Sequence, residues 1–197
     1  MELLEQGSGF PVDEIKIQSA LRRRLIYLIG DITESSVFET EYLLDRIVAL
    51  DKAIKLEDED YVIEPITIRL QTGGGSSSPA MGLIGQIEKL KDDGYFVIID
   101  SIGYCMSMGA IIITCGSHRR CHRYDKFMIH SLSAGVEGKL SDMQNTIKEF
   151  NSIQKTADEI ITSKTKITQK MLTSKSNADW YLTAQEALEY GLVDEIL

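Results

Sequence analysis

The sequence predicts an α/β domain of repeated strand–helix units with a largely parallel sheet. Three short apolar runs, at residues 25–29, 66–70 and 95–99, have the length and composition of buried strands. After each of the first two runs, apolar residues recur every three or four positions, as in an amphipathic helix. Strands joined through helices run parallel, because the chain must cross back over the sheet before the next strand begins.

The first third of the chain is expected to hold an arm, a strand and a helix. Residues 1–17 contain Gly, Ser and Pro without periodicity, which predicts a mobile N-terminal arm. The strand at 25–29 is closed by a glycine. Apolar positions within residues 37–54 then mark one face of a helix, and the acidic run 57–60 ends it as a solvated loop.

The middle third repeats this pattern twice. Three glycines at 73–75 break the second apolar run sharply, and a helical stripe follows within residues 81–90. The third apolar run is followed by a predicted loop through Gly103. The apolar run 107–113 then suits a helix packed inside the domain.

The last third contains a short strand and the longest helix. Residues 126–130 predict a strand that ends in a histidine, and spacings of three or four from 143 to 160 predict a long helix. Residues 183–186, Thr-Ala-Gln-Glu, form a capping box that opens a last short helix.

The composition favours one ordinary globular domain over the whole chain, residues 1–197. A net charge of −9 argues against a nucleic-acid groove or an anionic membrane surface. No apolar run approaches the ~20 residues of a membrane helix, and the acidic start lacks the pattern of a secretory signal. Cys105, Cys115 and Cys121 are a poor disulfide framework, so we expect a cytoplasmic location.

Three residues are candidates for nucleophilic catalysis, and each also has an ordinary structural explanation. Ser107 opens a predicted helix, where it has N–H groups nearby but where serine is also a common cap. His130 ends a strand, which would fix a general base, although a satisfied core histidine is the commoner case. Asp179 precedes two aromatic residues that would exclude water, and taken alone it is a loop aspartate.

Two further patterns have features of binding sites. The three glycines at 73–75 would let backbone N–H groups face a bound oxygen, but they lack the lysine of a phosphate-binding loop. His118, Cys121 and His122 have spacings that zinc sites use, but arginines lie between them and the second half of a Cys/His motif is missing. We therefore expect no metal and no cofactor.

The joint pattern of these residues resembles one family. Gly-Tyr-Cys-Met-Ser-Met-Gly-Ala at 103–110 is followed by Phe-Met-Ile-His at 127–130. Residues 179–197 read Asp-Trp-Tyr-Leu-Thr-Ala-Gln-Glu-Ala-Leu-Glu-Tyr-Gly-Leu-Val-Asp-Glu-Ile-Leu. In one register from about Arg24 to Leu197, these segments closely resemble the proteolytic subunit of the Clp protease.

The resemblance implies a serine endopeptidase with the ClpP/crotonase-like fold. Ser107 would be the nucleophile, His130 the general base and Asp179 the acid that orients the imidazole. The backbone N–H groups of Gly75 and Met108 would bind the oxyanion. By the same resemblance, residues 133–163 would form a protruding handle that joins two stacked heptameric rings.

The resemblance also implies partners. A Clp-type AAA+ unfoldase would use ATP and feed unfolded polypeptides into the chamber, so the chain itself would need no cofactor. Two departures bear on this expectation. Ala178 stands where the family has an arginine that pairs across the rings, and Thr67 and Arg69 fall at aromatic positions of the ATPase docking cleft.

Two alternatives to an active peptidase remain open at this point. One is a catalytically silent ring subunit that shapes a mixed assembly, although silent relatives usually lose a member of the triad. The other is a crotonase-fold enzyme that acts on acyl thioesters with the glycine loop as its oxyanion hole. That alternative leaves the Ser, His and Asp set without a role.

Overall fold

The structure of the protein is a computed structural model that describes residues 12–133, 135, 137–175 and 177–197. Its helices are α1 (Val12–Arg23), α2 (Glu34–Glu57), α3 (Ser77–Asp92), α4 (Met108–Ile113), α5 (Leu140–Lys164), α6 (Gln169–Lys175) and α7 (Ala184–Glu189). Its strands are β1 (Leu25–Ile29), β2 (Ile66–Thr72), β3 (Val97–Met106), β4 (His118–Cys121), β5 (Lys126–Ile129), β6 (Trp180–Thr183) and β7 (Glu195–Ile196).

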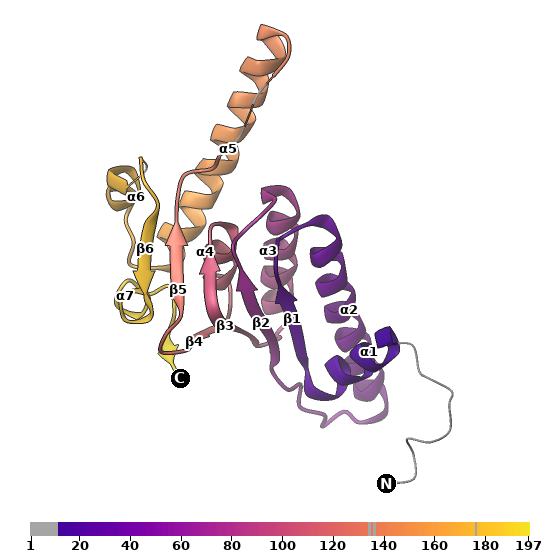
Figure 1. Cartoon of the computed structure of the whole chain (residues 1–197). Helices are drawn as coiled ribbons and strands as arrows, with labels where there is room; N and C mark the ends of the chain where they lie inside the picture. Colours follow the sequence, from indigo (N-terminus) through magenta and orange to yellow (C-terminus); the bar gives the residue numbers. More distant parts are fainter. Residues whose placement is uncertain (1–11, 134, 136, 176) are drawn as a thin grey trace.

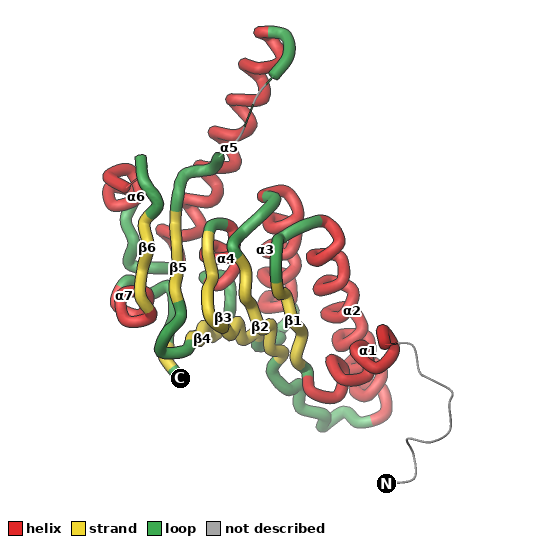
Figure 2. Tube along the Cα trace, viewed as in Figure 1, coloured by secondary structure: helices red, strands yellow, loops and turns green. Residues whose placement is uncertain are grey.

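The strands form a largely parallel sheet, as predicted. The order β1-β2-β3-β4-β7 is parallel throughout, and β5 also pairs parallel with β3. Strand β6 runs antiparallel to β5. Figure 2 shows the strands side by side from β6 at the left to β1 at the right. The α/β fold class is therefore confirmed, with an antiparallel edge.

The core lies between one face of the sheet and helices α2, α3 and α4. Along β2 buried and half-buried residues alternate, which is the pattern of a strand with one face in the core. Ile68, Leu70 and Ile99 are fully buried on that face, and Leu44 of α2 and Leu83 of α3 pack in the same core cluster. The carboxyl ends of β3 and β5 therefore rest on a rigid base.

The predicted loop through Gly103 is wrong, because the third strand continues to Met106. Gly103 has φ +82° and donates its N–H to the buried carboxylate of Asp125, at 2.7 Å. At this glycine β3 changes its partner from β4 to β5. A glycine within a strand can mark a bend rather than an end, and this bend directs the second half of β3 toward β5.

The predicted N-terminal arm is corrected in part. Residues 12–17 belong to helix α1, and residues 1–11 lie outside the described part of the chain. After α1, the Arg24 guanidinium makes two hydrogen bonds, of 2.7 and 2.9 Å, to the buried carboxylate of Asp51. Arginine matches carboxylate geometry well, so this pair fixes the start of β1 against α2.

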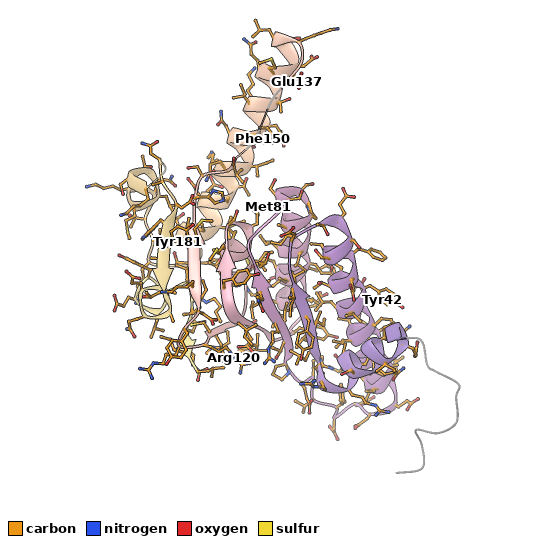
Figure 3. The ribbon with its side chains drawn as sticks, in the orientation of Figure 1. Tyr42, Met81, Arg120, Glu137, Phe150 and Tyr181 are labelled. Carbon is orange, nitrogen blue, oxygen red and sulfur yellow. The ribbon has the colours of Figure 1, made fainter. Side chains whose placement is uncertain are left out.

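Helix α5 projects from the rest of the fold (Figure 1). Only Ala157 and Ile161 of this helix are buried, and both lie in its second half. The apolar stripe continues into the first half, where Ile147 is 48% exposed, and Figure 3 shows Phe150 on the projecting part. Among the described residues, no helix is both long and apolar enough to cross a membrane.

Candidate active site

Ser107 sits in a constrained turn between β3 and α4. Its φ of +54° and ψ of −124° are rare for a residue with a side chain and cost free energy. Its N–H donates to the Met128 carbonyl oxygen at 2.8 Å, which ties the turn to β5. The side chain makes no capping hydrogen bond to α4. In this structure Ser107 is therefore not acting as a helix cap.

His130 lies beside Ser107 because β3 and β5 are parallel neighbours. Met106 pairs with Met128, so the residues after the two strands emerge at the same edge of the sheet. The His130 Nε2 atom is 2.8 Å from the Ser107 Oγ atom. With the proton on Nδ1, Nε2 accepts a hydrogen bond from the serine hydroxyl, as a general base must.

Asp179 faces the other side of the imidazole but at a longer distance. It precedes β6, whose residue Trp180 pairs with Ile129, and its Oδ1 atom is 3.9 Å from His130 Nδ1. The Tyr181 hydroxyl donates to its Oδ2 atom at 3.3 Å. The side chain is 50% exposed, so the expectation that the two aromatic residues shield it is wrong for this conformation.

The glycine loop approaches the nucleophile through Gly74. A Cβ atom at this position would lie 2.5 Å from the Ser107 Cβ atom, and its φ is +109°, so glycine is required there. Gly75 forms a parallel bridge with Ile32, in which Ile32 bonds to the carbonyl of Gly74 and the N–H of Ser76. The N–H of Gly75 therefore faces the opposite edge of the strand, toward β3.

The predicted oxyanion donors stay a prediction. The Gly75 N–H has the orientation just described, and Met108 is the first residue of α4, so its N–H has no partner within the helix. The structure distinguishes two of the three glycines, because a Cβ atom at Gly74 would meet the Ser107 side chain, whereas one at Gly75 would meet the backbone of Ile32.

Two adjoining cavities, of about 150 and 20 Å³, lie next to the Ser107–His130 pair. Both are lined by Ile129, His130, Gln154 and Asp158. The Gln154 side chain accepts the Leu132 N–H at 2.6 Å and donates to Asp158 at 2.6 Å. Sequence reasoning missed these two residues, although polar side chains four positions apart on an otherwise apolar helix face were the available signal.

The hydrogen bonds of the Gln154 side chain therefore hold the segment after His130 against α5. The Asp158 carboxylate also accepts a hydrogen bond from the Gln169 amide of α6, at 2.7 Å. The smaller cavity borders Ser107 directly and is otherwise lined mostly by apolar side chains, such as Met108, Ile111 and Ala157. A substrate side chain at this position would contact both apolar surface and the acidic residue.

The three cysteines and the histidines other than His130 lie outside the candidate active site. His118 contacts Glu195 at 2.9 Å, and the described residues contain no group of three or more side chains able to hold a metal ion. Burial raises the pKa of Cys115 to about 11 and that of Cys121 to about 12, and it raises the pKa of Cys105 well above its usual value. These thiols remain protonated near neutral pH and are poor nucleophiles.

Comparison with known proteins agrees with this geometry. The sequence model of the family described as Clp protease matches residues 12–197. The ATP-dependent Clp protease proteolytic subunit of Borreliella afzelii is 28% identical over 179 residues, which cover 90% of this chain and 84% of that protein. Proteolytic subunit 1 of Borreliella burgdorferi is also 28% identical over 179 residues, covering 90% and 86%.

A third similar protein, the ATP-dependent Clp protease proteolytic subunit of Borrelia garinii subsp. bavariensis, is 29% identical over 179 residues, 90% of this chain and 86% of that protein. The low identity marks this chain as divergent, and the match spans almost its whole length. The sequence match, the largely parallel sheet and the Ser107–His130 contact agree, and the chain belongs to the Clp protease family.

Proposed function

We propose that the chain is a serine endopeptidase subunit that cleaves unfolded polypeptides and short peptides through Ser107, His130 and Asp179. The observation that carries the proposal is the 2.8 Å contact between Ser107 Oγ and His130 Nε2. This serine also occupies a strained turn and makes no capping bond. A strained backbone and a hydroxyl that contacts a histidine instead of capping the helix are typical of a nucleophile at a strand-to-helix turn.

In this mechanism Ser107 attacks the peptide carbonyl while His130 takes its proton and passes it to the leaving amine. Asp179 stabilises the imidazolium that forms. The N–H groups of Gly75 and Met108 bind the oxyanion, and each such donor typically lowers the barrier by about 3 kcal/mol. Water then hydrolyses the acyl-enzyme with His130 as the base, so the chain supplies every catalytic group and needs no cofactor of its own.

We further propose that the chain assembles as two stacked heptameric rings. The exposed apolar residues on the first half of α5, including Ile147, support this, because such a stripe needs a partner surface. Pairing across the rings would cover it. A Clp-type AAA+ unfoldase would then use ATP to deliver polypeptides to the enclosed chamber.

One observation favours the alternative of a catalytically silent ring subunit. The 3.9 Å between His130 and Asp179 is longer than a hydrogen bond, so the acid is not engaged in this conformation. The crotonase-like alternative gains no such support, because acyl-thioester chemistry gives the Ser107–His130 contact no role.

A fluorophosphonate probe tests the proposal directly. The probe reacts with activated serine nucleophiles, and mass spectrometry of the digested protein identifies the labelled peptide. We expect one modified residue, Ser107. An assembled protein in which Ser107 stays unmodified over hours would support the silent subunit instead.

A further inference from the structure

The two cavities beside the Ser107–His130 pair meet at the side chains of Gln154 and Asp158. The smaller cavity borders Ser107 and is otherwise lined mostly by apolar side chains, whereas mostly polar side chains line the larger one. One water needs about 10–15 Å³ of such space, so the larger cavity, of about 150 Å³, has room for a long side chain. A substrate side chain that enters beside Ser107 therefore meets apolar walls along its stem and polar groups at its end.

The Asp158 carboxylate lies where the two cavities meet and is held from both sides. Its Oδ1 atom accepts a hydrogen bond from the Gln154 amide at 2.6 Å, and its Oδ2 atom accepts one from the Gln169 amide at 2.7 Å. The Gln154 carbonyl oxygen is fixed in turn by the Leu132 N–H, at 2.6 Å. The carboxylate is therefore already ordered before a substrate group reaches it, which favours binding.

Asp158 also keeps its negative charge and part of its hydrogen-bonding capacity. A carboxylate offers about four acceptor positions, and the two amides occupy two of them. Both amides are neutral, and within the described part of the chain Asp158 forms no ion pair. Lys155, one turn earlier on α5, pairs with Glu159 instead. Asp158 is half-buried, so a substrate group that brings a positive charge to it is favoured.

Lys175 is the one lysine or arginine that lines the larger cavity among the described residues, and it does not pair with Asp158. Its Nζ atom lies 5.9 Å from the centre of the Trp180 ring, in the range of a cation–π contact. Lys175 does not line the smaller cavity, whose only acidic residue is Asp158. The charge beside Ser107 is therefore negative where a substrate side chain would end.

We propose that Asp158 makes the protein prefer a basic residue, lysine or arginine, as the residue whose carbonyl Ser107 attacks. The side chain of that residue lies closest to the serine and enters the smaller cavity. Its apolar stem packs against side chains such as Met108 and Ile111, and its charged end donates to the Asp158 carboxylate. This inference rests on the peptidase function proposed above. An apolar side chain would desolvate the carboxylate and offer it no new partner.

Cleavage of four fluorogenic peptides that differ only at this residue tests the proposal. The four residues are lysine, acetyl-lysine, norleucine and glutamate. Acetyl-lysine has no charge, and norleucine keeps the four-carbon stem without the amine. We expect kcat/KM for the lysine peptide to exceed that of the other three at least tenfold, because hydrogen bonds between charged groups are the stronger ones. The glutamate peptide should be the poorest, because its charge has the sign of Asp158.

A matched pair of variants assigns the preference to Asp158. Asp158→Asn keeps the size of the side chain but removes its charge, so the ratio of kcat/KM for lysine to that for norleucine should fall to about one. Glu159→Gln removes a charge from the next residue of α5, whose side chain is 65% exposed, and should keep the ratio. A smaller fraction of active protein lowers both rates equally, so the ratio reports specificity even if a variant folds poorly.

Calorimetric titration of the Ser107→Ala variant with the same peptides, amidated in place of the fluorophore, separates this proposal from the peptidase function. Tightest binding of the lysine peptide without cleavage by the unmodified chain would overturn the peptidase function alone. Cleavage of the norleucine peptide as efficient as that of the lysine peptide would overturn the basic preference alone. Absence of cleavage together with equal affinities, or with no heat of binding up to about 1 mM, would overturn both.

Discussion

His130 lies 2.8 Å from the Ser107 hydroxyl through Nε2 and 3.9 Å from the Asp179 carboxylate through Nδ1. The nucleophile and the base are thus in contact, while the acid stands roughly 1 Å beyond hydrogen-bond distance. Its other oxygen accepts a bond from the exposed Tyr181 hydroxyl. A small movement of the segment before β6 separates this arrangement from a complete triad.

Ser107→Ala should abolish both probe labelling and peptide cleavage, because it removes the hydroxyl that contacts His130 Nε2. Assembly should be unchanged, since the substitution removes only the hydroxyl oxygen and no packing contact in the hydrophobic core is lost. The measurements are labelling by mass spectrometry and size by sedimentation, with the exposed Ser35→Ala as the control. Labelling that survives in Ser107→Ala would refute the assignment.

Asp179→Asn should lower kcat by about 10²–10⁴, because an amide cannot stabilise the imidazolium and favours the wrong tautomer. Tyr181→Phe removes the hydroxyl that bonds Asp179 without touching the carboxylate, and it should retain the activity. Steady-state cleavage of a fluorogenic peptide measures both variants. If Asp179→Asn loses less than threefold, Asp179 is not the catalytic acid.

Ile147→Asp or Phe150→Asp should give single rings or smaller species, because either change places a charge in the apolar stripe on α5. Lys148→Asp, on the exposed polar side of the same turn, should assemble normally. Sedimentation velocity distinguishes the species. The handle interpretation is wrong if all three variants sediment like the unmodified chain.

Folded substrates should be degraded poorly with a standard Clp unfoldase, although short peptides are cleaved. By the resemblance, Thr67 and Arg69 stand at two aromatic docking positions. Burial of each ring is worth about 1.5–3 kcal/mol, so we expect docking to be weakened a hundredfold or more. ATP-dependent loss of a tagged fluorescent protein measures this. Efficient degradation by the unmodified chain would show that its docking uses other residues.

Restoring tyrosines at Thr67 and Arg69 should recover part of that degradation. The structure adds a condition, because Arg69 is the main partner of the buried Asp100 carboxylate. Arg69→Tyr alone would leave that charge unpaired, which typically costs 3–5 kcal/mol. The rescue therefore needs Asp100→Leu as a third change, and the double variant without it serves as the comparison.

The thiols should be unreactive in the folded protein. With the pKa of Cys115 near 11 and that of Cys121 near 12, only about a thousandth or less of either is thiolate at pH 8, against roughly a quarter for a free thiol. Iodoacetamide should modify all three cysteines in urea and almost none before unfolding. Rapid alkylation of the native chain at Cys115 or Cys121 would contradict the burial.

The same shifts give a pH dependence of stability. A folded-state pKa above the unfolded value means that the stabilisation is present below about pH 9 and is lost as the pH rises toward 11 and 12. The urea midpoint should therefore fall over this alkaline range. Cys121→Ala should show a shallower fall than the unmodified chain.

The sequence was sufficient for elements whose apolar pattern is long enough to be periodic. Strands β1 and β2 and helices α2, α3 and α5 were predicted at nearly their observed positions. Strands β4, β6 and β7 were missed, because His-Arg-Arg-Cys, Trp-Tyr-Leu-Thr and Glu-Ile are too short and polar to show a period. Their pairing is set by tertiary contacts that local patterns do not encode.

The residues of the candidate site could likewise be predicted only in part from the sequence. Ser107 opens a predicted helix and His130 ends a predicted strand, and only the resemblance to the family predicted that they act together. In the structure they meet because β3 and β5 are parallel neighbours, which the predicted loop through Gly103 did not anticipate. The position of Asp179 depends on the antiparallel pairing of β6, which was not predicted, and on the bond from Tyr181.

The close approach of Gly74 to Ser107 means that a sequence can keep all three candidate catalytic residues and still be inactive. A methyl group at position 74 would overlap the serine side chain and push the hydroxyl away from His130. Gly74→Ala is thus a route to a folded but inert subunit that an inspection of Ser, His and Asp alone would count as active. Sorting divergent relatives into working and silent ring members therefore requires reading the loop under the nucleophile as well as the triad.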